Sequence, residues 1–175
     1  MPQKKSFSAL KPVARFILLF FILLLVFALI FGYFRSHYPK VVTDYLVFTT
    51  SVVKAFLSLI GLKIRAGGTS IFSDKFAIEV ILECAGVYQA LVFSAAVLAF
   101  PADVKKKIWG ILIAVPLFYI IDILRISTMF LIGSYKPAWF GFFHLYTGQM
   151  IVIFLVIFFW IIWLKKMALN ERKSA

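Results

Sequence analysis

Residues 16–34 read FILLFFILLLVFALIFGYF and carry no charged side chain. A helix needs about 20 consecutive apolar residues to cross the hydrocarbon core of a bilayer. The basic residues before this run resemble the start of a secretory signal, but the run is long and no A-x-A cleavage site follows it. We therefore expect residues 16–34 to form an uncleaved membrane anchor.

The composition of the whole chain requires lipid as its solvent. Of the 175 residues, 63% are hydrophobic and 18% aromatic, more apolar surface than a soluble domain of this size can bury. Three further runs are apolar enough to span, 85–100, 108–133 and 149–164; the first and third have only 16 residues and need tilt or a locally adapted bilayer. We predict an all-α integral membrane bundle with four spanning helices in a single domain, residues 1–175.

Two segments differ from these spans. In residues 41–62, Asp44, Ser51, Lys54 and Ser58 fall on one helical face, which is typical of an amphipathic helix in the membrane interface or of one that turns a polar face to a site.

Residues 63–83 contain two turn signals, Gly67-Gly68 and Ser73-Asp74. Apolar and polar side chains then alternate from Phe76 to Glu83 with a period of two. This pattern predicts a small outer β-hairpin that leads the chain to Cys84.

The basic residues indicate the topology. A formal net charge of +12 suggests a nucleic-acid partner, but these residues cluster at the ends of apolar runs, where lipid headgroups and the positive-inside bias account for them. The N-terminal tail, the loop 101–107 and the C-terminal tail hold 11 of the 19 basic residues (4 + 3 + 4). We expect all three in the cytoplasm of a cell with this protein in its inner or plasma membrane. Four spans satisfy this arrangement, and five do not.

This topology places three reactive residues toward the outer face. Cys84 is the only cysteine, which excludes an internal disulfide and a Cys-based zinc site. It precedes an apolar helix whose N-terminal N–H groups would stabilise a thiolate, although a lone cysteine in an apolar region is usually a small hydrophobic residue.

Arg125 and His144 are less common in such surroundings. An arginine within a spanning helix costs about 2.5 kcal/mol or more. Asp122, three residues earlier, offers it an ion pair that would stabilise helix packing. His144 on its own fits an interfacial aromatic belt. Arg125 is expected roughly 12 Å below the outer end of its helix, at about 1.5 Å per residue.

Together the three side chains suit attack on a peptide carbonyl. The thiol is the nucleophile, the guanidinium a donor to the oxyanion, and the imidazole an acid for the leaving amine. No metal or other cofactor is expected. Candidate supporting or substrate-binding residues lie nearby in the sequence: Gly86, Asp122, Tyr88, Tyr146 and Gln149. Glu79 and Glu83 could orient His144 or bind the substrate. Glu83 is a weak candidate for a catalytic role, because a carboxylate beside Cys84 raises the pKa of the thiol.

The ordered set of motifs resembles the exosortase/archaeosortase family of membrane cysteine transpeptidases, and the small exosortase H type most closely. Four short motifs carry the resemblance, which extends over roughly residues 59–164: Cys84-Ala85-Gly86, Ala99-Phe100-Pro101 with its basic loop, Leu124-Arg125-Ile126 and Phe143-His144-Leu145-Tyr146. One departure is Asp122, because the family often has asparagine three residues before the arginine.

The resemblance implies a substrate and a reaction. The substrate would be a secreted protein that ends in a recognition motif, one transmembrane helix and a basic tail. Cys84 would form a thioester at the motif, Arg125 would hold the oxyanion, and His144 would protonate the leaving amine. The acyl group would then pass to an acceptor nucleophile at the cell surface. From the residues alone, a non-catalytic membrane scaffold and a small transporter with Asp122 and Arg125 on its path stay open.

Overall fold

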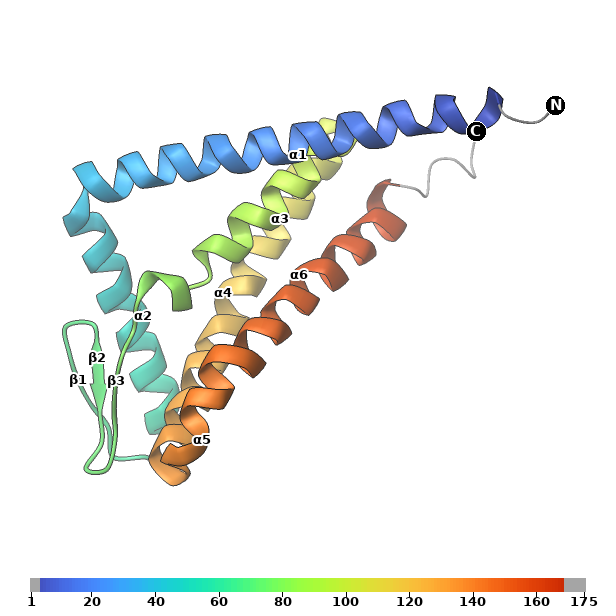
Figure 1. Cartoon of the computed structure of the whole chain (residues 1–175). Coiled ribbons are helices and arrows are strands. Elements are labelled where there is room, and N and C mark those ends of the chain that lie inside the picture. Colours follow the sequence, from blue (N-terminus) through green and yellow to red (C-terminus); the bar gives the residue numbers. More distant parts are fainter. Residues whose placement is uncertain (1–3, 169–175) are drawn as a thin grey trace.

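The computed structural model describes the backbone of residues 4–168 and, within it, the side chains of residues 11–146 and 150–166. Helices dominate the chain, and a small sheet follows α2 in the sequence and lies beside it (Figure 1). The helices are α1 (Lys4–His37), α2 (Pro39–Leu59), α3 (Val87–Ala99), α4 (Val104–Tyr135), α5 (Pro137–Phe142) and α6 (Gly148–Trp163). The strands are β1 (Arg65–Gly67), β2 (Ser70–Phe72) and β3 (Ala77–Glu79).

Four helical stretches of the described chain have the length and composition to cross a membrane: Lys11–His37, Pro39–Leu59, Val104–Tyr135 and Pro137–Lys166. The protein is therefore a multi-pass membrane protein, and the predicted all-α membrane bundle is confirmed. The predicted spans 16–34, 108–133 and 149–164 fall within three of these stretches. The fourth stretch is α2, where the sequence predicted an interfacial helix.

The helix α3 occupies most of the predicted span 85–100, which stays a prediction. It has 13 residues, which at about 1.5 Å per residue cover roughly 20 Å of a core about 30 Å thick. The helix starts late because Leu82–Cys84 form a 3₁₀ turn and Gly86 adopts a left-handed φ of +75°. It ends at Phe100, which is extended ahead of Pro101.

Two cores of buried side chains share α4. The basic-end core combines α3, the first half of α4 and the end of α6 through Phe93, Val97, Ala114, Phe118 and Trp163. The sheet-end core combines α2, the sheet and the second half of α4 through Val53, Leu57, Ile64, Ile71, Val80, Ile123, Ile126 and Phe130. The buried residues of α2 in this second core place α2 beside the sheet, and its interfacial position stays a prediction.

The sheet has three antiparallel strands in the order β1-β2-β3, one strand more than the predicted hairpin. The Ser73 hydroxyl accepts the N–H of Phe76 at 3.1 Å and closes the turn between β2 and β3. Ile71 and Val80 are buried against the helices, whereas Glu79 is exposed. The predicted alternation of apolar and polar side chains therefore follows the two faces of β3 and its continuation.

Aromatic contacts bring the basic segments to one end of the molecule. The Phe16 ring of α1 stacks on Trp160 of α6 with centroids 5.8 Å apart, and it meets Phe100 edge-on at 6.2 Å. The Trp163 indole N–H donates to the carbonyl of Lys106 at 3.2 Å. Figure 1 shows the start of α1 and the end of α6 on the same side, opposite the sheet and α5.

Candidate active site

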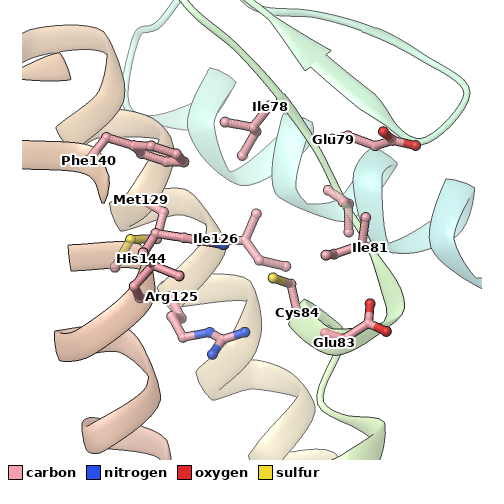
Figure 2. A pocket seen from close by; sticks show the side chains of 12 residues that line it. Ile78, Glu79, Ile81, Glu83, Cys84, Arg125, Ile126, Met129, Phe140 and His144 are labelled. Carbon is pink, nitrogen blue, oxygen red and sulfur yellow. The ribbon is translucent and has the colours of Figure 1, made fainter. Parts of the chain in front are cut away.

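A cavity of about 160 Å³ lies between the sheet and the helices, and it contains all three predicted catalytic residues. Its walls come from the end of β3 and the turn after it, from α4, and from α5 with the turn that follows. The lining residues are Ile78, Glu79, Val80, Ile81, Glu83, Cys84, Arg125, Ile126, Met129, Phe140, His144 and Leu145. Figure 2 shows Cys84 and Arg125 directed into this space from opposite walls.

The three residues lie at similar distances along the chain from the basic segments. Cys84 and Arg125 lie 17 and 18 residues from the basic loop 101–107 (101 − 84 and 125 − 107), and His144 lies 21 residues before Lys165. The sequence placed Cys84 at the outer surface and Arg125 well below it. In the structure, Cys84 and Arg125 line the same cavity.

Cys84 ends the 3₁₀ turn, and its N–H donates to the carbonyl of Ile81 at 2.9 Å. Burial is the main cause that raises the pKa of the thiol; the charges of Asp122 and Glu83 raise it further, and Arg125 opposes them. The thiol therefore rests in its neutral form at neutral pH, and Arg125 supplies the positive charge that favours the thiolate.

The loop after Cys84 is held from two sides. The Tyr45 hydroxyl of α2 donates to the carbonyl of Ala85 at 2.5 Å. On the other side, a Cβ at Gly86 would lie 2.7 Å from the Asp122 carboxylate. The left-handed φ of Gly86 and this close approach both require glycine.

Substituting Gly86 with alanine is expected to destabilise the fold by about 2–5 kcal/mol, because a left-handed residue costs about 1–2 kcal/mol and an overpacked side chain about 1–3 kcal/mol. Thermal unfolding of the detergent-solubilised protein measures this loss. Gly32→Ala is the matched control, because a Cβ at Gly32 meets nothing within 4 Å. Equal stability of the two variants would contradict the expectation.

Arg125 is paired as the sequence predicted. Its Nε lies 3.1 Å from Asp122 Oδ1, and the two side chains are only 15% and 3% exposed. Asp122 is not among the residues that line the cavity. The ion pair therefore holds the guanidinium from outside the cavity. The guanidinium itself extends into the cavity toward Cys84 (Figure 2). A planar guanidinium held in this way can donate hydrogen bonds to a developing oxyanion.

His144 lies on the opposite wall, in a π-helical turn between α5 and α6, Phe143–Thr147. Its ring stacks on Phe140 with centroids 5.4 Å apart and an interplanar angle of 14°. Isolated π turns occur frequently at functional sites. The wide turn and the stacked ring place an exposed imidazole at the edge of the cavity.

Comparison with known proteins identifies the family of the chain. A family model described as transmembrane exosortase matches residues 8–171. The chain belongs to the transmembrane exosortase family. Archaeosortase A of Haloferax volcanii is 30% identical over 82 residues, which are 47% of this chain and 25% of that relative. The match thus spans a quarter of the relative's length, and no solved structure matches.

Not every residue predicted to support an exosortase site reaches the cavity. Tyr88 packs edge-on against Phe31 of α1 at 5.6 Å, and the exposed Tyr146 lies 5.7 Å from the Phe142 ring. Neither tyrosine lines the cavity. The predicted Gln149 side chain lies outside the described residues.

Other residues in or near the cavity were not predicted. Tyr45 is 40 residues from the carbonyl it binds, and no local pattern signals such a contact. Met129 and Phe140 form part of the wall but read as ordinary apolar positions. Glu79 and Glu83, which the sequence indicated as possible orienting or binding residues, both line the cavity.

The raised pKa of Cys84 predicts how its alkylation depends on pH. Because the thiol is neutral at neutral pH, the rate of alkylation should increase as the pH rises through the raised pKa. Glu83→Gln removes one charge that raises this pKa, so its rate profile should shift to lower pH. Glu79→Gln is the control, because Glu79 is not among the causes of the shift. An unchanged profile for Glu83→Gln would contradict the assignment.

Proposed function

We propose that this exosortase family member is a membrane cysteine peptidase and transpeptidase that removes a C-terminal sorting signal from secreted proteins. One observation carries the proposal: Cys84, Arg125 and His144, from three separate segments, line one cavity. Family membership supports the same class of reaction. A scaffold that used Asp122 and Arg125 only for packing would not require the thiol and the imidazole at the same cavity.

The proposed reaction proceeds through a thioester. The Cys84 thiol gives its proton to His144 as the sulfur attacks the scissile carbonyl carbon, and Arg125 donates to the oxygen that becomes negative. His144 then protonates the leaving amine as the C–N bond breaks. The acyl group remains on sulfur until an acceptor nucleophile attacks, at which point His144 accepts the acceptor's proton and the thiolate leaves.

We further propose that the cavity faces the outer leaflet of a bacterial or archaeal cell membrane. The basic segments near Phe16, in the loop 101–107 and at the end of α6 lie at the opposite end of the molecule. Such segments remain in the cytoplasm. A secreted substrate would then meet Cys84 on the side to which it is exported.

Reporters inserted at two positions test this orientation. After Lys106, a reporter that works only in the cytoplasm is expected to be active. After Gly68, in the turn between β1 and β2, a reporter that works only outside the cytoplasm is expected to be active. The positive-inside bias is the physical reason. The reverse pattern would place Cys84 on the cytoplasmic side and rule out a secreted substrate.

The function itself is tested on secreted proteins that end in a motif, an apolar helix and a basic tail. Their mature C-termini are compared by mass spectrometry in cells with and without this protein. Loss of the helix and tail only when the protein is present supports the proposal, and the mass of the new C-terminus distinguishes an attached acceptor from water. Identical C-termini in both cells would refute it.

A further inference from the structure

The strand nearest Cys84 has one unpaired edge. β2 occupies one side of β3, and the ladder bonds that flank β3 join Phe76 to Ser73 and Val80 to Thr69, each at 2.8 Å. Because in-plane bonding alternates along an antiparallel strand, the N–H and C=O groups of Ala77 and Glu79 face away from β2. Among the described residues these groups have no hydrogen-bond partner.

The cavity runs along this edge. Its wall includes four consecutive residues, 78–81. Side chains of consecutive strand residues point to opposite faces, so a cavity that all four line lies beside the strand edge and not over one face. The opposite wall contains Phe140 and His144 (Figure 2). The space is therefore a slot between the free edge of β3 and the turn that carries His144.

The same edge continues directly to the nucleophile. Beyond β3, the chain passes through Val80 and Ile81, and the Ile81 carbonyl accepts the N–H of Cys84. A chain bound along Glu79 and Ile81 would thus meet the sulfur within a few residues. The donors and acceptors of the edge alternate, which matches the backbone of an extended peptide.

We propose that the recognition segment of the substrate binds in this slot as an added β-strand on the free edge of β3, which delivers its scissile carbonyl to Cys84. This inference rests on the proposed function and adds the conformation of the substrate and the residues that align it. Backbone hydrogen bonds from Ala77 and Glu79 would supply affinity, and the apolar wall around Met129 and Phe140 would read alternate side chains.

Cysteine-directed probes test the added strand without a known substrate. Iodoacetyl-trialanine amide, iodoacetamide, and an iodoacetyl-trialanine amide N-methylated at its backbone are compared for the rate of Cys84 alkylation in the detergent-solubilised protein. The trialanine probe is expected to react about tenfold faster than the other two, because only it has both the peptide backbone and its N–H donors. Rates are normalised to those with free cysteine.

A pair of variants isolates the edge N–H. Glu79→Pro removes both the side chain and the N–H that faces the slot, and proline is tolerated at such edge positions. Glu79→Ala removes only the side chain, which accepts a hydrogen bond from Thr69. The preference for the trialanine probe should fall in Glu79→Pro and persist in Glu79→Ala. If Glu79→Pro does not fold, the N-methylated probe still tests the added strand on the wild-type protein, because this probe lacks the N–H groups that would donate to the carbonyl groups of the edge.

The outcomes separate the two proposals. Suppose that Cys84 reacts with iodoacetamide but no faster with the trialanine probe, or that the N-methylated probe reacts as fast as the unmethylated trialanine probe. Either result refutes the added strand and leaves the proposed function standing. If Cys84 in the native protein reacts with none of the reagents, the accessible nucleophile of the proposed function is itself refuted.

Discussion

Replacing Cys84 with alanine is expected to abolish removal of the substrate tail while the protein remains folded and inserted. Loss of a catalytic nucleophile costs on the order of 10⁴–10⁶ in rate, which in a cell is complete loss of processing. The fold should persist because Cys84 is only half-buried, at the margin of the sheet-end core. Mass spectrometry of the substrate C-terminus measures the effect.

Cys84→Ser is the companion variant. It keeps the size of the side chain but offers a hydroxyl, which is a much weaker nucleophile without a strong base, so processing should also stop. Equal amounts of both variants and of the wild-type protein in the membrane fraction exclude a folding defect. Normal processing in either variant would rule out the thioester mechanism.

Replacing Asp122 with alanine is expected to cause the largest loss of stability. Asp122 is 2% exposed and is the partner of the mostly buried Arg125. Removing one partner of a buried ion pair leaves the other charge uncompensated and costs about 3–5 kcal/mol. Thermal unfolding in detergent should show a markedly lower midpoint.

Two further variants separate charge from geometry. Asp122→Asn keeps an oxygen acceptor for Arg125 but removes a charge that raises the pKa of Cys84, so its alkylation profile should shift to lower pH. Arg125→Lys keeps a positive charge beside Asp122 but loses the planar fork, so it should remain folded and lose most processing. If Asp122→Ala is as stable as the wild type, the ion pair is not structural.

The sequence predicted the class of the fold and singled out three residues that line one cavity, because both depend on strong local signals. A bilayer requires long apolar runs, and charge placement at their ends is a robust pattern. An arginine within such a run, a lone cysteine and a histidine at the start of the last helix are each unusual, and the structure brings the three to one cavity. The Asp122–Arg125 pair followed from helical spacing alone.

What the sequence did not predict depends on contacts across the chain. The late start of α3 is set by Gly86, whose left-handed conformation is fitted against Asp122, 36 residues later (122 − 86). The third strand escaped prediction because strands as short as β1 have almost no periodicity to recognise. Tyr88 and Tyr146 were chosen for their closeness in sequence, but helical geometry turns both away from the cavity.

Under the proposed function, the position of Cys84 relative to the membrane would also determine where along a substrate the cleavage falls. A nucleophile held beside Arg125 would act at a fixed distance from the membrane surface. A target tethered by its own membrane helix presents each peptide bond at a height set by its distance from that helix. Three extra residues inserted before the helix would raise the bond by about 10 Å when extended, so spacing would select substrates as strictly as the motif itself.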